Sequence, residues 1–183
     1  QGYSSAASDV YKRQILYQSK YGATKKYVDW LVEELGYDYV ETKDAKVANL
    51  LNYDVIILGG GVYASGIAGL QFLKKNIGQL TGKKIAVFAV GASPYEEKAI
   101  QQVREMHFKD ALSNIPSFYC RGAWDEEKMK FTDRTLCKML QKAVAKHNPD
   151  EYEPWQKALM CAVGKKCDLS LIHISEPTRL GMI

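Results

Sequence analysis

The chain has 183 residues, of which 46% are hydrophobic and 25% are charged, and its formal net charge is +4. This composition excludes intrinsic disorder and is typical of one globular domain of ordinary size. The lysines are scattered rather than clustered, so nucleic acid is not expected as a partner, and no apolar run reaches the roughly 18 residues of a membrane-spanning helix.

The two ends of the chain differ in character from the rest. Residues 5–14 (SAASDVYKRQ) and 168–183 (DLSLIHISEPTRLGMI) resemble translated sequencing-adapter sequence, and neither stretch has a strand or helix period. We therefore expect one domain over residues 15–167, with residues 1–14 and 168–183 as non-native ends. The four cysteines form no Cys-x-x-Cys motif, which indicates free thiols in a reducing cytoplasm.

The first element is an apolar strand, Ile15-Leu16-Tyr17, followed by the hexapeptide Ser19-Lys20-Tyr21-Gly22-Ala23-Thr24 and then by a segment with helical periodicity. A strand that turns through hydroxyl residues and a glycine into a helix is suited to binding phosphate. The start of the helix supplies unpaired N–H groups and the positive end of the helix dipole. The alternative is a helix capped by Thr24 with no ligand.

Strand and helix signals alternate along the remainder of the chain. Strands are predicted at 37–40, 53–58, 84–90 and 116–120, and helices at 70–77, 96–112 and 131–147. Apolar residues at 155–163 share one face of a further helix, which packs on the domain or instead contacts a membrane surface or a partner helix. Alternation of this kind predicts an α/β fold with a doubly wound, five-stranded parallel sheet and helices on both faces.

Three of the predicted strands end in loops rich in glycine and small residues. These are 19–24, 59–66 and 91–94, and all three are expected at the carboxyl edge of the sheet, where ligands of such folds bind.

The three loops resemble those of flavodoxin-like proteins. The first is similar to the family's phosphate loop, Ser/Thr-x-Thr-Gly-x-Thr, but has Tyr21 where a small hydroxyl residue is usual. The segments Gly60-Gly61-Val62-Tyr63-Ala64-Ser65-Gly66 and Gly91-Ala92-Ser93-Pro94 resemble the two loops beside the flavin ring. Within the superfamily, the stretch 118–123 and the pair Asp133-Arg134 resemble the group that includes menaquinone-dependent protoporphyrinogen oxidase.

The resemblance implies FMN as the cofactor. The residues that it implies at the cofactor are Ser19, Lys20, Tyr21, Gly22, Ala23, Thr24, Gly60, Gly61, Val62, Tyr63, Ala64, Gly91, Ala92 and Ser93. Tyr63 is expected to stack on the ring, the alternative being a loop tyrosine that packs on a neighbouring helix. Ser93 either binds the polar edge of the ring or caps the helix that follows. No catalytic side chain and no metal ligand is expected, because flavin chemistry belongs to the cofactor.

The function implied by the resemblance is electron transfer by a cytoplasmic FMN protein. Its partner would be a redox protein, or a quinone that accepts electrons from protoporphyrinogen in heme biosynthesis. The basic charge suits the propionates of a porphyrinogen and peripheral contact with the inner face of a membrane. The alternative is a flavodoxin-like module without FMN that serves as a regulatory or interaction domain.

Overall fold

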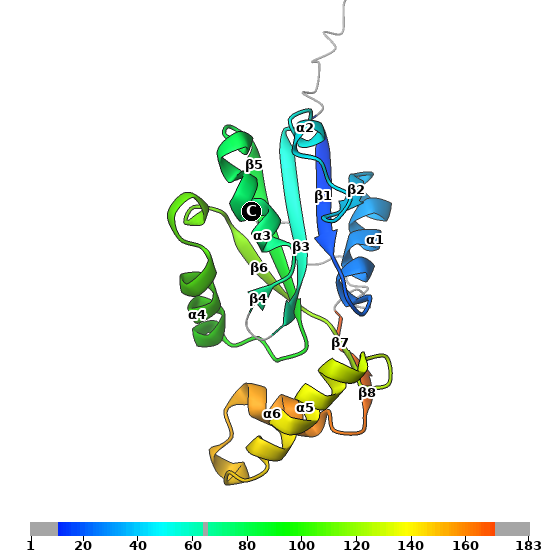
Figure 1. Cartoon of the computed structure of the whole chain (residues 1–183), viewed down its shortest axis with the longest axis vertical. Coiled ribbons are helices and arrows are strands. Elements are labelled where there is room, and N and C mark those ends of the chain that lie inside the picture. The colour runs from blue at the N-terminus through cyan, green and yellow to red at the C-terminus, as the bar shows by residue number, and fades with distance from the viewer. Residues whose placement is uncertain (1–10, 64–65, 171–183) are drawn as a thin grey trace, which may run out of the picture.

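The computed structural model describes residues 11–63 and 66–170. Its centre is a sheet with the strand order β2-β1-β3-β5-β6 (Figure 1). These strands are β1 (Arg13–Gln18), β2 (Asp38–Glu41), β3 (Val55–Tyr63), β5 (Lys84–Gly91) and β6 (Ser117–Arg121). Neighbouring strands in this order are parallel throughout. The predicted doubly wound parallel sheet is confirmed, and its strand order reverses between β1 and β3.

Helices cover both faces of the sheet, as predicted. Helix α1 (Ala23–Leu35) packs on one face, where its Val28 joins Ile15 and Phe88 in an apolar cluster. Helices α2 (Val47–Leu50), α3 (Leu70–Asn76) and α4 (Glu97–His107) contribute to the cluster on the other face. Because the central strands are covered on both sides, their side chains form continuous apolar runs.

The strand β3 extends further than the sequence predicts. It runs through Gly59, Gly60 and Gly61 to Tyr63 and then pairs antiparallel with β4 (Gly66–Ile67). These strand positions suit glycine because neighbouring groups occupy the space that a side chain would fill. A Cβ on Gly60 would lie 2.2 Å from the carbonyl oxygen of Ala68. The glycines therefore permit close packing within the strand and do not end it.

Two predicted helices are shorter than expected. The helix α3 ends at Asn76 and continues as a 3-10 turn, η1 (Ile77–Leu80), so Gly78 does not end it. The helix α4 ends at His107 and is followed by a separate 3-10 turn, η2 (Asp110–Leu112). In the second case the backbone leaves the helical region at Phe108 (φ −103°, ψ 73°) and is extended at Lys109, which ends the helix before η2 begins.

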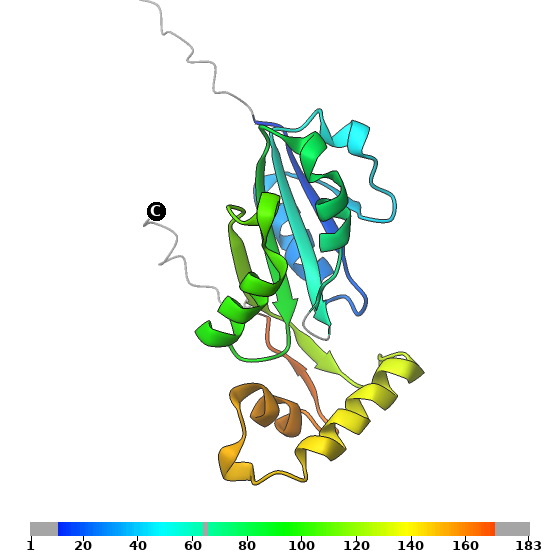
Figure 2. The ribbon, with the colours of Figure 1, turned by 60° about the vertical axis from the view of Figure 1, so that its left-hand side comes forward.

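A small second body, the C-terminal unit (residues 123–168), lies beyond the carboxyl edge of the sheet (Figures 1 and 2). It consists of β7 (Ala123–Asp125), α5 (Phe131–Val144), the 3-10 turn η3 (Pro149–Glu151), α6 (Pro154–Cys161) and β8 (Lys166–Asp168). The strands β7 and β8 pair antiparallel with each other, apart from the main sheet. Leu159 of α6 is buried, and α6 contacts α5, so the packing interpretation of this late helix holds.

The helix α5 leaves most of its apolar stripe exposed. Leu136, Met139 and Leu140 are 64%, 63% and 45% exposed, whereas Val144 of the same stripe is buried. The helix lies below the sheet instead of on its face (Figure 2). It contacts α6, and Asp133 near its N-terminal end pairs with Lys20. Phe118 of β6, the register partner of the buried Phe88, is correspondingly 60% exposed.

The boundaries of the expected non-native ends do not coincide with the boundaries of the fold. Arg13 and Gln14 belong to β1, and Asp168 belongs to β8. These three residues have regular strand structure, and the interpretation of the two ends as non-native stays a prediction. Residues 1–10 and 171–183 lie outside the described residues.

Candidate functional site at the carboxyl edge of the sheet

The first loop joins β1 to α1 through a left-handed glycine. Gly22 is the N-cap of α1 with φ 92°, a conformation that a residue with a Cβ rarely adopts. The Ser19 hydroxyl oxygen accepts hydrogen bonds from the N–H groups of Gly22 at 3.1 Å and Lys25 at 3.4 Å. The alternative that Thr24 caps the helix is wrong, because Thr24 is the second helical residue and is 1% exposed.

This loop presents backbone donors that the fold itself does not use. Within residues 11–63 and 66–170, the N–H groups of Tyr21, Ala23 and Thr24 have no hydrogen-bond partner. They lie at the start of the 13-residue helix α1, where the helix dipole is positive. A phosphate is the ligand that such a group of donors binds best.

The second predicted segment lies at the end of β3, directly beside the first loop. The hydroxyl oxygen of Tyr63 accepts a 3.2 Å hydrogen bond from the backbone N–H of Lys20. The rings of Tyr21 and Tyr63 meet edge to face, with 6.3 Å between centroids. Tyr63 is 39% exposed and folds back over Gly61, whose Cβ would lie 2.7 Å from the Tyr63 hydroxyl oxygen. Val62 lies next to it in the strand, and Ala64 lies outside the described residues.

The third segment, Gly91-Ala92-Ser93, is fixed by its carbonyl groups. The Gly122 N–H donates to the Gly91 carbonyl at 2.8 Å, and the Tyr119 hydroxyl donates to the Ser93 carbonyl at 2.8 Å. The N–H groups of Ala92 and Ser93 have no partner in the part of the chain that the structure describes. Ser93 does not cap α4, whose N-cap is Glu96. Two backbone donors thus remain for the oxygen-rich edge of a ring.

Contacts between neighbouring residues join the three segments at one edge. Lys20 connects the first segment to Tyr63. A Cβ on Gly122 would lie 3.3 Å from Ala23 Cβ and 3.7 Å from the Gly91 carbonyl oxygen, so the first and third segments both border Gly122. The sequence-predicted residues that the structure describes therefore lie together, with phosphate-type donors in the first segment and further donors in the third.

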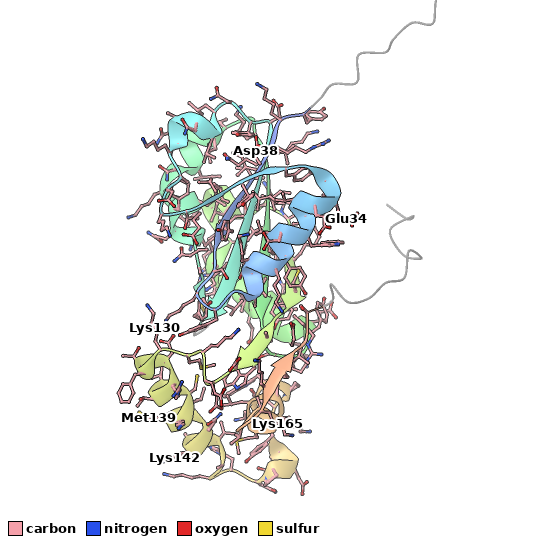
Figure 3. All side chains as sticks on the ribbon, turned by 90° about the vertical axis from the view of Figure 1, so that its right-hand side faces the viewer. Glu34, Asp38, Lys130, Met139, Lys142 and Lys165 are labelled. Carbon is pink, nitrogen blue, oxygen red and sulfur yellow. The ribbon has the colours of Figure 1, made fainter. Side chains whose placement is uncertain are left out.

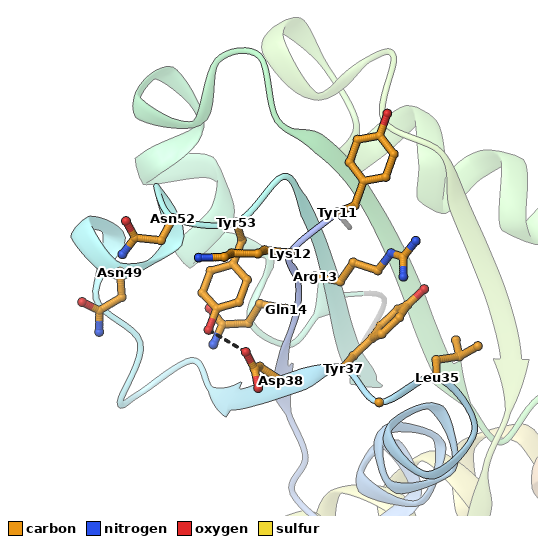
Figure 4. Close-up of a pocket in the computed structure, with 11 residues that line it drawn as sticks. Tyr11, Lys12, Arg13, Gln14, Leu35, Tyr37, Asp38, Asn49, Asn52 and Tyr53 are labelled. Carbon is orange, nitrogen blue, oxygen red and sulfur yellow. Dashed lines mark hydrogen bonds between the residues drawn. The ribbon is translucent and has the colours of Figure 1, made fainter. Parts of the chain in front are cut away.

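Two grooves lie on opposite edges of the sheet. One of about 720 Å³ is lined by Ser19, Lys20, Thr42, Tyr63 and Phe72 among others, so it includes the first and second segments but not the third. The other, of about 580 Å³, lies at the amino edge between β1, β2 and α2 (Figure 4). Tyr53 there donates a 2.9 Å hydrogen bond to Asp38. Because ligands of doubly wound sheets bind at the carboxyl edge, only the first groove belongs to the candidate site.

Sequence reasoning missed one member of the site, Asp133. Its carboxylate pairs with the Lys20 ammonium and accepts a hydrogen bond from the Tyr21 hydroxyl. These bonds from Lys20 and then Tyr21 lower the pKa of Asp133, and the bond to Asp133 raises the pKa of Lys20. No local signal could have revealed this contact, because 112 residues separate Tyr21 from Asp133 in the chain.

The titratable groups near the third segment are set by burial. Burial raises the pKa of Tyr119 to about 12 and that of Cys120 to about 11. Cys120 is thus a neutral thiol at physiological pH, as expected for a small residue packed in a core. Within the described residues, no group of three His, Cys, Asp or Glu side chains could hold a metal ion.

Comparison with known proteins identifies a family. The family model described as "Flavodoxin domain" matches residues 14–151. No curated protein matches the chain. Among solved structures, the Trp repressor binding protein from Bacillus subtilis is 16% identical with a TM-score of 0.47, covering 61% of this chain and 85% of that one.

Two further solved structures with a similar fold are those of a flavodoxin and a flavoprotein. The two-electron reduced flavodoxin of Megasphaera elsdenii is 23% identical with a TM-score of 0.43, covering 58% of this chain and 84% of that one. A flavoprotein in complex with FMN from Lactobacillus acidophilus is 21% identical with a TM-score of 0.41, covering 61% and 93%.

Proposed function

Because the chain belongs to the flavodoxin-domain family, we propose that it is a redox protein that binds FMN at the carboxyl edge of its sheet. The observation that carries this proposal is the set of unpaired N–H groups of Tyr21, Ala23 and Thr24 at the left-handed turn into α1. These donors suit the phosphate of FMN.

Different residues at the edge would hold different parts of the cofactor. FMN, when bound, supplies the exchange of one or two electrons. The first loop would hold the phosphate, and the N–H groups of Ala92 and Ser93 would orient the polar edge of the ring. Tyr63 borders the same space and would exclude water from one side of the ring. An aromatic, apolar neighbour disfavours a charged reduced ring and so lowers its reduction potential.

The proposal is tested by the purified chain and its absorption spectrum. We expect the protein to be yellow or to become yellow on addition of FMN, and to bind FMN more tightly than riboflavin. A colourless protein that takes up neither flavin would contradict the proposal. That result would favour the alternative, a flavodoxin-like module without FMN that acts in regulation or interaction.

A second, narrower candidate is the oxidation of protoporphyrinogen with a quinone as acceptor. The observation that favours it is the exposed apolar stripe of α5, formed by Leu136, Met139 and Leu140. Asp133, on the first turn of the same helix, contacts Lys20, so the stripe begins beside the phosphate loop. Porphyrinogens and quinones have large apolar ring systems, and an uncovered apolar surface next to the proposed flavin edge suits these rings.

Lysines flank this stripe and suit an anionic reactant or surface. Lys130, Met139 and Lys142 are labelled on α5 in Figure 3, and Met139 and Lys142 lie on its exposed side. Among the other basic residues near the edge, Lys20 pairs with Asp133 and Lys25 pairs with Asp29. No helix within the described ranges is long and apolar enough to cross a membrane. We propose that contact with a membrane involves the exposed surface of α5.

An enzyme assay separates this candidate from a simple electron carrier. If the chain is an oxidase, protoporphyrinogen and a menaquinone analogue should be consumed together by the FMN-loaded protein. Slow turnover with every quinone, combined with rapid electron exchange with a second redox protein, would select the carrier instead.

A further inference from the structure

Tyr21, which stands where the family's phosphate loop usually has a small hydroxyl residue, reaches out of the loop to the C-terminal unit. Its hydroxyl donates to the carboxylate of Asp133 and accepts a 3.3 Å hydrogen bond from the backbone N–H of Lys130. Both partners lie at the start of α5. The phenol is therefore an anchor between two parts of the chain, while the backbone N–H of Tyr21 stays available in the loop.

Lys20 makes a second connection between the same two parts. Its ammonium pairs with the same carboxylate oxygen of Asp133 that receives the Tyr21 hydroxyl. It also lies 5.6 Å from the centroid of the Tyr21 ring and 5.8 Å from that of Tyr63. The Lys20 ammonium is thus held between two aromatic rings and the Asp133 carboxylate.

The charge of this arrangement is unusual for a loop that binds an anion. The start of α1, the unpaired N–H groups and Lys20 all favour negative charge, and Asp133 already places a carboxylate at the loop. The phosphate of FMN carries about two negative charges near neutral pH. Phosphate and carboxylate would therefore compete for Lys20 and repel each other at short range.

We propose that Asp133 sets the affinity of the loop for the phosphate group of FMN by competing with it for Lys20, and that FMN and the C-terminal unit are thereby coupled. This inference rests on the proposed function. Coupling between two binding events is reciprocal. If the carboxylate weakens the binding of the phosphate, the phosphate weakens the contact between α5 and the loop by the same factor. FMN binding then loosens the C-terminal unit, and riboflavin, which has no phosphate, does not.

The first test compares flavin affinities in variants of the full chain. Asp133→Asn keeps a side chain of the same size but removes the charge. We expect it to tighten FMN by up to about fivefold at low salt, the range of an exposed charge pair, with riboflavin unchanged. In a Lys20→Gln background the gain should become smaller, because only the direct repulsion between carboxylate and phosphate remains. The matched control is Asp125→Asn, which removes a carboxylate of the same unit that pairs with Lys166 and not with the loop. It should leave FMN affinity unchanged.

The second test follows the C-terminal unit directly by amide hydrogen exchange. Added FMN should speed exchange in α5, and equal occupancy by riboflavin should leave it as it was. Unchanged or weaker FMN binding by Asp133→Asn would overturn the inference, as would faster exchange with both flavins. If the wild-type chain binds no FMN but Asp133→Asn does, the competition is supported in its strongest form. If neither the wild type nor Asp133→Asn binds FMN, both the inference and the proposed function fail. If the wild type binds FMN and Asp133→Asn does not, the proposed function stands and only the inference is overturned.

Discussion

The backbone N–H of Lys20 and the phenolic oxygen of Tyr63, 43 residues apart in the chain, are joined by a 3.2 Å hydrogen bond. The two segments that would hold the phosphate and one side of the flavin ring are thus in direct contact. The bond also means that one N–H of the phosphate loop already has a partner, which distinguishes Lys20 from Tyr21, Ala23 and Thr24.

The two functions of Tyr63, its ring and its hydroxyl, can be separated by substitution. Tyr63→Phe keeps the ring and frees the Lys20 N–H, so bound FMN should stay quenched in fluorescence. Tyr63→Ala removes the aromatic neighbour, so fluorescence should rise and the reduction potential should shift upward. Fluorescence and potentiometric titration measure both effects. Identical spectra for wild type and Tyr63→Ala would show that Tyr63 does not face the ring.

Thr24 should discriminate between flavins with and without phosphate. Its side chain is 1% exposed at the second position of α1, beneath the predicted phosphate. Removal of its hydroxyl by Thr24→Ala should cost FMN about 1–3 kcal/mol, the range of a hydrogen bond to a charged group, and should cost riboflavin little. Thr24→Ser is the control that keeps the hydroxyl. Calorimetry that finds equal losses for both flavins would place Thr24 away from the phosphate.

Gly60 should be intolerant of any side chain. A Cβ there would lie 2.2 Å from the Ala68 carbonyl oxygen and 2.8 Å from Ile67 Cγ2, so Gly60→Ala forces β3 and β4 apart. We expect a loss of about 1–3 kcal/mol in the free energy of unfolding, typical of an overpacked interior. Urea denaturation measures it. Gly78→Ala is the matched control, because nothing lies within 4 Å of its Cβ position. Equal stability of the two variants would show that β3 and β4 can separate freely.

The exposed stripe of α5 should matter for association and not for folding. Leu136→Ser and Met139→Ser should change the free energy of unfolding by less than about 0.5 kcal/mol, as surface substitutions do. By contrast, Leu73→Ala in the buried core should cost about 2–5 kcal/mol. If α5 contacts an anionic surface, the same two serine variants should bind phosphatidylserine vesicles more weakly. A large loss of stability in either would mean that another part of the chain covers the stripe.

Asp168 should make the attachment of the C-terminal unit sensitive to acid. Hydrogen bonds from Lys26 and then Ser170 lower its pKa to about 2. A carboxyl group with a depressed pKa contributes stability that is complete above its unfolded pKa of about 4 and is lost as the pH falls toward 2. Wild type should therefore exceed Asp168→Asn in stability at pH 6, and the difference should vanish near pH 2. A constant difference across this range would show that Lys26 and Asp168 do not interact in solution.

The order and type of the central elements could be read from the sequence because each depends on local pattern. The runs at 55–58 and 85–90 are apolar at every position, which is typical of covered parallel strands. The extent of β3 could not be predicted in the same way. Three consecutive glycines normally interrupt a strand, and only the positions of Phe88 and Ala68 across from them show why they continue it here.

The placement of α5 could not be predicted from its periodicity. The residues Leu136, Met139, Leu140 and Val144 share a helical face, but the spacing says nothing about which surface that face meets. In the same way, the resemblance singles out the pair Asp133-Arg134 in the first turn of α5 but does not place Asp133 at the phosphate loop. Its role depends on contacts with Lys20 and Tyr21, which lie far from it in the sequence and close to it only in the folded protein.

The pairing of β7 with β8 gives the molecule a modular construction. Ala123 lies opposite Asp168 in register, and the Leu169 N–H donates to the Gly122 carbonyl at 3.0 Å. The chain therefore leaves the sheet and returns to its edge at almost the same place. Residues between these points form a cassette whose excision, with a short joint in its place, would not reroute any strand of the main sheet. Because this segment contains Asp133, which contacts Lys20, its exchange by loop grafting would keep the main sheet but would change the charge at the first loop.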